Sequence, residues 1–186
     1  MEGKLNQTKV MVGLVFLLLF VSPISAWNFK NTDDDFNFIE ETPEVTLTDL
    51  VKYVEVYGTD VGDIILDQNV YANVTNLTEG YNNGFTVTNG TILALNPGLY
   101  HVMSQWSFSG GANTEYHVFL SHNGVRQINC HAERVIGTGG DVGSASYTCI
   151  LRLDVGDYVI PVVENVDSAV DPTIHDFQLN LIQVGN

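Results

Sequence analysis

The sequence predicts an all-β protein, an antiparallel sandwich preceded by an N-terminal extension. From residue 64 onward, short segments alternate apolar and polar residues, and turn-forming residues separate these segments at regular intervals. No segment after residue 60 has apolar residues at helical spacing. At 186 residues, the chain has room for one such domain, which is large enough to fold without a metal or a disulfide.

The chain begins with a hydrophobic segment that has the layout of a secretory signal peptide. Lys4 and Lys9 precede an almost wholly apolar run at residues 10–21, and small residues follow as far as Ala26. We favour cleavage after Ala26. Because residues 10–29 carry no charge, an uncleaved membrane anchor is the alternative, and it is the only contact with a membrane that we expect.

Residues 27–60 are predicted to be a linker or stalk between this hydrophobic segment (1–26) and a head (61–186). Its first half is rich in acidic residues that repel one another. Apolar residues between positions 47 and 54 have helical spacing, whereas Tyr53–Tyr57 has the composition of a strand. A short helix that leads into a first strand would satisfy both interpretations.

Within the head, turn-forming residues set the boundaries of the strands. Asn123-Gly124 is the strongest hairpin signal because this dipeptide suits a type I′ turn. A glycine-rich segment, 137–143, predicts a second and longer connection. The expected strands are Ile64–Leu66, Gly84–Thr88, Thr91–Leu95, Leu99–Phe108, Tyr116–Ser121, Val125–Arg134, Ser144–Leu153, Tyr158–Glu164 and Asp176–Val184.

The order of turns and strands resembles the globular head of the C1q/TNF family. A Pro97-Gly98-Leu-Tyr turn is followed by the Asn-Gly hairpin, by Leu153-Asp-Val-Gly-Asp-Tyr-Val159, and by a closing apolar strand. The resemblance extends over residues 64–184. It implies a jelly-roll sandwich and, as in most members of the family, a homotrimer.

Two strands near the C-terminus have apolar residues on both faces, which indicates that both faces are covered. Val159, Ile160, Val162 and Val163 belong to the first of them, and Leu181 and Ile182 to the second. In C1q-like heads the corresponding strands lie on the inner sheet. The residues that this similarity assigns to the core or to the trimer interface are Tyr158, Ile160, Phe177, Leu179 and Leu181.

The charge of the chain excludes several classes of partner. Seven Lys and Arg residues stand against 22 Asp and Glu residues, and the formal net charge is −15. Nucleic acids and anionic membrane surfaces are therefore disfavoured as ligands. We interpret the acidity as a source of solubility. Calcium binding is the weaker alternative, and its best candidates, which lack EF-hand spacing, are Asp167, Asp171 and Asp176.

The two cysteines, Cys130 and Cys149, flank the glycine-rich connection symmetrically. If the strands on either side pair as a hairpin, these cysteines lie opposite each other and within reach of a disulfide. Two buried thiols are the alternative, and the residues alone leave both open.

No arrangement of residues predicts catalysis or a metal site. His131 follows Cys130, but neighbouring strand residues point to opposite faces, so the pair does not form a nucleophile and base. Asp154 and Asp157 flank Gly156 in what we interpret as a turn. The remaining histidines lack metal-ligand spacing; they are His101, His117, His122 and His175.

The sequence therefore predicts a non-enzymatic structural or binding protein that forms a homotrimer and needs no cofactor. We expect a virion surface protein (decoration, spike or fibre), whose partners are other virion proteins or a host surface ligand. The first alternative is a secreted C1q-like ligand-binding protein, located outside the cell. The second is an exported carbohydrate-active sandwich enzyme, which would need two carboxylates beside the scissile bond.

Overall fold

The computed structural model describes residues 51–138 and 141–186. The predicted signal peptide or anchor, most of the predicted linker, and the centre of the glycine-rich connection lie outside the described residues. Within the described part of the chain, no helix has the length and hydropathy needed to cross a membrane.

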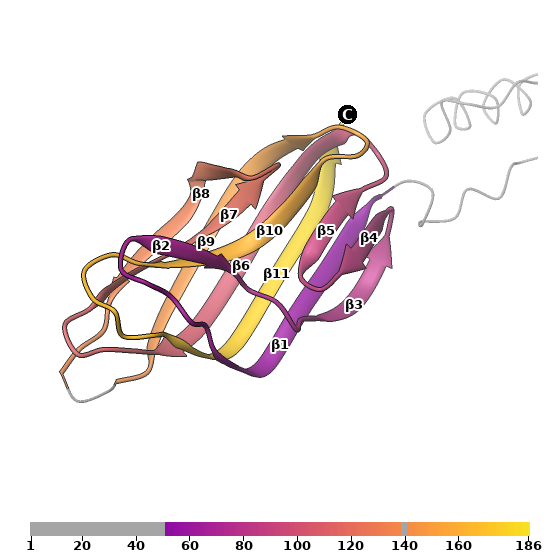
Figure 1. Cartoon of the computed structure of the whole chain (residues 1–186). Helices are drawn as coiled ribbons and strands as arrows, with labels where there is room; N and C mark the ends of the chain where they lie inside the picture. The colour runs from indigo at the N-terminus through magenta and orange to yellow at the C-terminus, as the bar shows by residue number, and fades with distance from the viewer. Residues whose placement is uncertain (1–50, 139–140) are drawn as a thin grey trace, which may run out of the picture. The chain divides into compact units, whose positions relative to one another are not determined.

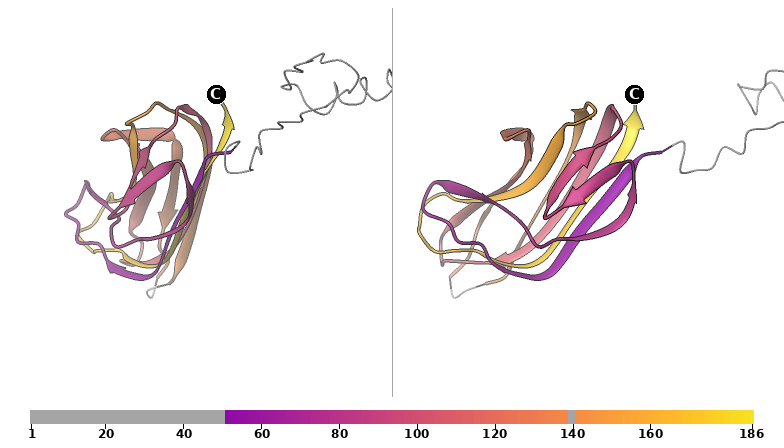
Figure 2. Two further views of the ribbon diagram at one scale, coloured as in Figure 1. Left: turned by 90° about the vertical axis from the view of Figure 1, so that its right-hand side faces the viewer. Right: turned by 45° about the vertical axis from the view of Figure 1, so that its right-hand side comes forward.

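The described residues form eleven strands in two antiparallel sheets, which lie as two layers in Figures 1 and 2. The first, five-stranded sheet has the order β3-β1-β11-β6-β9. The second, six-stranded sheet has the order β4-β5-β10-β7-β8, with β2 also paired to β10. The strands are β1 (Tyr53–Asp63), β2 (Val70–Asn73), β3 (Thr78–Asn83), β4 (Phe85–Thr88), β5 (Thr91–Ala94), β6 (Gly98–Ser109), β7 (Glu115–His122), β8 (Val125–Val135), β9 (Gly143–Leu153), β10 (Tyr158–Asn165) and β11 (Thr173–Gly185). This arrangement confirms the predicted antiparallel jelly-roll sandwich.

Alternate side chains of each central strand fill the space between the sheets. Along β6, Tyr100, Val102, Trp106 and Phe108 are all buried, and their neighbours face away from the core. The Phe108 ring meets the Tyr116 ring of β7 edge to face, with centroids 5.7 Å apart. This contact joins the two sheets, because β6 and β7 belong to different layers.

The hairpin turns have the backbone conformations that their residues predict. Asn123 and Gly124 both have positive φ, 51° and 81°, as the type I′ turn between β7 and β8 requires. Asn89 and Gly90 adopt similar angles, 48° and 80°, between β4 and β5. These turns fix the register at the ends of their hairpins.

Two expectations about the N-terminal part of the sandwich need correction, and two strands were not predicted. Tyr53–Tyr57 is part of β1, which pairs with β11, so the sandwich includes residues that the sequence assigned to the linker. Ile64–Leu66 is not a strand. It is held in a loop by a hydrogen bond from the Leu66 N–H to Asp171 Oδ1 (2.7 Å). The apolar side chain of Leu66 is buried, so it contributes to the core without belonging to a strand. The polar segment that follows contains two short strands, β2 and β3, that the sequence analysis did not predict.

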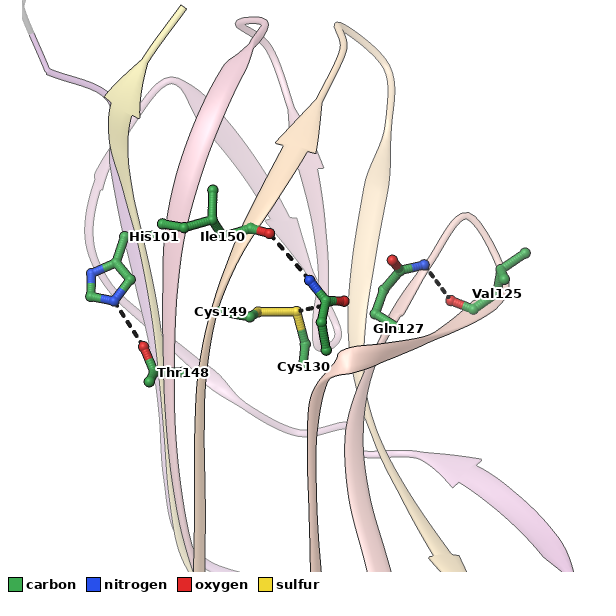
Figure 3. Close-up of a disulfide and its surroundings, with 8 residues drawn as sticks. His101, Val125, Gln127, Cys130, Thr148, Cys149 and Ile150 are labelled. Carbon is green, nitrogen blue, oxygen red and sulfur yellow. Dashed lines mark hydrogen bonds between the residues drawn. A yellow bond between two sulfur atoms is a disulfide. The ribbon is translucent and has the colours of Figure 1, made fainter.

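A disulfide joins Cys130 of β8 to Cys149 of β9, with their Cα atoms 5.3 Å apart (Figure 3). The expectation that these cysteines face each other within a hairpin is wrong, because β8 and β9 are the edge strands of different sheets. The bond therefore crosses from one layer to the other along one open side of the sandwich. It links two edges that backbone hydrogen bonds within a sheet cannot connect.

We expect replacement of both cysteines by alanine to lower the free energy of unfolding by about 3 kcal/mol. The bond closes a loop of 19 residues. Closing a loop of about that length removes conformational entropy from the unfolded chain, and the free energy of this loss is about 3 kcal/mol. Alanine adds no polar group at the buried Cys130 position. Chemical denaturation of the wild type with and without reductant, beside the double variant, measures the effect. Equal stability of the oxidised and reduced wild type would contradict this prediction.

Candidate functional site

The outer face of the five-stranded sheet is a regular surface made by the side chains that alternate with the core. Strand register arranges these outward residues in three rows across β1, β11, β6 and β9. The first row is Tyr53, Ile182, His101 and Ile150; the second is Glu55, Asn180, Met103 and Thr148; the third is Tyr57, Gln178, Gln105 and Ser146.

The centre of this outer face, made by these three rows, is nearly free of charge, although the chain as a whole is strongly acidic. The exposed charged residues Asp176 and Arg152 lie in the rows on either side of it. In these three rows Glu55 is the one Asp or Glu side chain, and it accepts a hydrogen bond from Gln178 Nε2 at 2.8 Å. Tyr57, Ile150 and Ile182 remain 41%, 50% and 38% exposed. Large exposed apolar side chains without neighbouring charges are typical of the centre of a protein interface.

A shallow groove of about 480 Å³ lies at one end of these rows. Outward side chains that line it include Tyr57, Gln105 and Gln178, and the inward pair Trp106 and Phe177 forms part of its wall. The Trp106 and Phe177 rings contact each other edge to face, with centroids 4.5 Å apart. The groove is therefore lined by amide and aromatic side chains together with the carboxylates of Glu55 and Asp176.

The five residues proposed for the core or the trimer interface do not lie on one surface. Phe177, Leu179 and Leu181 are at most 3% exposed and pack between the sheets, so they cannot contact another chain. Tyr158 and Ile160 are half-buried residues of β10, which belongs to the other sheet. The alternation along β11 is visible in the sequence, but the side that faces inward is not. The outward side of β11 carries Gln178, Asn180 and Ile182.

The outer face of the six-stranded sheet has a different character. Phe119 of β7 and Val162 of β10 lie opposite each other on this face and are almost fully buried. The Tyr71 ring meets Phe119 edge to face at 5.8 Å, and the Arg126 guanidinium lies 4.6 Å from the Phe119 ring centroid. The arginine is thereby held over an aromatic ring beside the charged residues of β7, β8 and β10.

Two histidines that appear unrelated in the sequence meet on this face. His117 of β7 and His131 of β8 lie near Glu133, and each of the three offers one ligand atom within 4.8 Å of the others. This cluster could not be predicted from the sequence, because a bulge in β8 changes which residues of β7 and β8 lie side by side. Ser121 pairs with Arg126, but Phe119 pairs with His131. An unbroken register would have placed His131 opposite Tyr116, on the core side.

Cys130 and His131 point to opposite faces of β8, as expected for neighbouring residues of a strand. Cys130 is fully buried in the core, whereas His131 is on the outer face. A cysteine nucleophile with this histidine as its base is therefore not present.

The three aspartates considered for calcium do not converge. Asp167 Oδ1 accepts the Glu115 N–H at 3.0 Å, and Asp171 Oδ1 accepts the Leu66 N–H at 2.7 Å. Asp176 lies on β11, at the groove. Among the described residues, the group of side chains that could hold a metal ion is instead His117, His131 and Glu133.

Asp154 and Asp157 belong to a turn, as the sequence predicted. The carboxylate of Asp157 accepts hydrogen bonds from the Asp154 N–H (2.9 Å) and from Asn123 Nδ2 (2.8 Å). These bonds tie the β9–β10 turn to the β7–β8 turn. The Asp154 N–H is the main reason why the pKa of Asp157 falls to about 2.

No protein-family model matches the chain, and no curated protein matches it in sequence. Its fold is similar to those of solved structures of the TNF type. Eiger TNF from S. frugiperda superimposes with a TM-score of 0.56 at 14% identity, over 73% of this chain and 94% of that chain. Murine APRIL at pH 5.0 gives a TM-score of 0.54 at 14% identity, over 72% of this chain and all (100%) of that chain.

These likenesses define the class of the domain as a TNF-like jelly roll. They confirm the fold that the resemblance to C1q/TNF heads implied. At identities of this size they show the fold alone.

The lowered pKa of Asp157 makes the stability of the fold depend on pH in the acid range. Because the pKa of this carboxylate is lower in the folded chain than the ordinary value of 3.8, it stabilises the fold above about pH 4. This contribution is lost as the pH falls towards 2. We expect Asp157→Asn to be less stable than wild type at pH 5–7, and the difference to shrink between pH 4 and pH 2. Denaturant titrations at each pH measure it.

Asp154→Asn is the matched control, because it removes an exposed carboxylate from the same turn and leaves the donating backbone N–H in place. A difference between Asp157→Asn and wild type that stays constant down to pH 2 would contradict the assignment.

Proposed function

We propose that the head is a non-enzymatic binding module that forms a homotrimer through the outer face of its five-stranded sheet. The observation that carries this proposal is the near absence of charge from that face. The chain has 22 acidic residues, yet the three outward rows hold one, Glu55, which is paired with Gln178. A face whose centre combines exposed apolar residues with uncharged polar ones on such a protein is explained by contact with another copy. The resemblance to C1q/TNF heads supports the same assembly.

Contact between subunits must overcome the repulsion between their negative charges. Each subunit carries a formal charge of −15, so subunits repel one another at long range. Burial of apolar area contributes about 25 cal/mol per Å², and a standard interface buries about 800 Å² on each partner. The association must rely on this burial, since attractive charges are scarce. Added salt screens the repulsion and therefore strengthens the trimer.

We further propose that this module belongs to the surface of a virion, as a decoration, spike or fibre protein. Two features of the sequence support this setting: the acidic composition, and the lack of a collagen-like Gly-X-Y stretch in residues 27–60. The alternative is a secreted ligand-binding protein of a cell, and the cross-sheet disulfide is compatible with either location. A carbohydrate-active enzyme has one observation in its favour, the two carboxylates Glu55 and Asp176 that line the groove, but Glu55 is already hydrogen-bonded to Gln178.

The two settings differ in where the mature protein is found. Fractionation of the native source, with N-terminal sequencing of each fraction, distinguishes them. Protein that copurifies with particles supports the virion proposal, whether its N-terminus is intact or begins at Trp27. Protein that begins at Trp27 and is found only free in the medium supports secretion and would overturn the proposal.

Assembly is tested by light scattering on the purified chain at micromolar concentration and moderate salt. We expect the mass of a trimer for the wild type. Ile182→Glu places a charge in the first outward row, and we expect a threefold lower mass, because three buried carboxylates would have no partner.

Val155→Glu is the control, since Val155 is 64% exposed in the β9–β10 turn, away from the sheet face. A monomeric wild type, or an Ile182→Glu variant that keeps the mass of a trimer, would refute assembly through this face.

A further inference from the structure

The outer face of the β7–β8 hairpin presents nitrogen and oxygen atoms at the separations found around a tetrahedral metal ion. Nε2 of His131 lies 3.1 Å from Oε1 of Glu133, and Nε2 of His117 lies 3.6 Å from the same oxygen. Metal–ligand bonds of about 2.0–2.2 Å at tetrahedral angles place neighbouring ligand atoms about 3.3–3.6 Å apart. Two edges of such a tetrahedron are thus already close to the required length.

We propose that His117, His131 and Glu133 form a binding site for a divalent transition-metal ion, with zinc as the ion that the ligand set suits best. Two imidazoles and one carboxylate are a common zinc ligand set, whereas calcium and magnesium prefer oxygen ligands alone. The three residues come from adjacent paired strands, so an ion could bind without rearrangement of the backbone.

A buried ring nitrogen of the cluster that lacks a hydrogen-bond partner also supports a bound ion. Nε2 of His131 is buried and makes no hydrogen bond, although Oε1 of Glu133 is near it. A buried ring nitrogen without a hydrogen bond is costly unless an ion or another group completes it.

The charged groups around the site carry a net negative charge that a divalent cation would balance. The carboxylates of Glu115, Glu133 and Glu164 all lie within 4 Å of a His117 ring nitrogen, and Arg126 is the cation beside them. With both histidines neutral, these four charged groups sum to −2. A divalent cation would neutralise the cluster, and this offsets the mutual repulsion of its carboxylates.

The residues around His117 also fit the usual support of a zinc-bound histidine. When Nε2 binds the ion, Nδ1 carries the proton, and Glu164 Oε2 lies 3.4 Å from Nδ1 to accept it. Arg126 Nη1 donates to this same carboxylate oxygen at 3.0 Å and so holds it in place. Arg126 Nη2, which is now 3.2 Å from Nδ1, must turn away when the ion binds.

The site is open to solvent on its carboxylate side. The Glu133 and Glu115 side chains are 53% and 34% exposed, whereas those of His117 and His131 are 15% and 21% exposed. Oε1 of Glu115 lies 3.0 Å from Nε2 of His117, so this carboxylate or a water molecule can take the fourth position. The ion would join the bulged part of β8 to β7. This inference does not depend on trimer formation, because all three ligands belong to one chain.

The test is a titration of the full, metal-free chain with zinc, followed by calorimetry and thermal unfolding. We expect one zinc ion per chain and a higher midpoint of thermal unfolding with zinc. The double variant His117→Ala with His131→Ala should bind zinc at least about 100-fold more weakly, since two of three ligands are gone. His122→Ala with His175→Ala removes the same number of histidines outside the cluster and should bind zinc as the wild type does.

A second variant and a second metal keep the test independent of folding. Glu133→Gln preserves both histidines and the shape of the side chain, and we expect it to weaken zinc binding while circular dichroism stays unchanged. Cobalt should give the intense visible absorption of a tetrahedral site in the wild type and not in the histidine variant. The proposal is overturned if zinc fails to saturate at one ion per chain, if the variant that lacks His117 and His131 binds as tightly as wild type, or if calcium competes equally.

Discussion

Burial of alternate side chains between two sheets is the interaction on which the rest of this structure depends. Once Tyr100, Val102, Trp106 and Phe108 face the core, the residues between them must face outward. The same alternation on β11 buries Leu179 and leaves its neighbours on the surface. Each sheet thus acquires an outer face whose composition is not decided by the core. One outer face is nearly uncharged, and the other gathers histidines, glutamates and an arginine.

The bulge in β8 gives the second outer face its chemistry. Because the register changes between Ser121 and Phe119, Cys130 turns inward to the disulfide and His131 turns outward to His117. A strand without the bulge would exchange these two positions, which would break the bond between the sheets and disperse the histidine cluster. One local irregularity therefore supports both the covalent link between the layers and the candidate metal site.

The sequence predicted the parts of the fold that depend on local chemistry. Asn123-Gly124 and the turn around Gly156 were recognised because their conformations need those residues, and the long alternating strands were recognised by their period. It could not show which side of β11 faces inward, so Phe177, Leu179 and Leu181 were considered for an interface although they are core residues. It also could not show that β8 and β9 belong to different sheets, or that β8 is bulged, because both depend on long-range pairing. Strand β3 lacks the apolar pattern by which strands are recognised, and β2, at four residues, is too short to show a period.

We propose that the outer face of the five-stranded sheet is covered in solution by other copies of the chain. Hydroxyl-radical footprinting at increasing protein concentration tests it residue by residue. We expect labelling of Tyr57, Ile150 and Ile182 to fall as the protein concentration rises, while labelling of the exposed residues Ile128 and Val155 stays constant. Labelling of Tyr57, Ile150 and Ile182 that is independent of concentration and as strong as at Ile128 would contradict it.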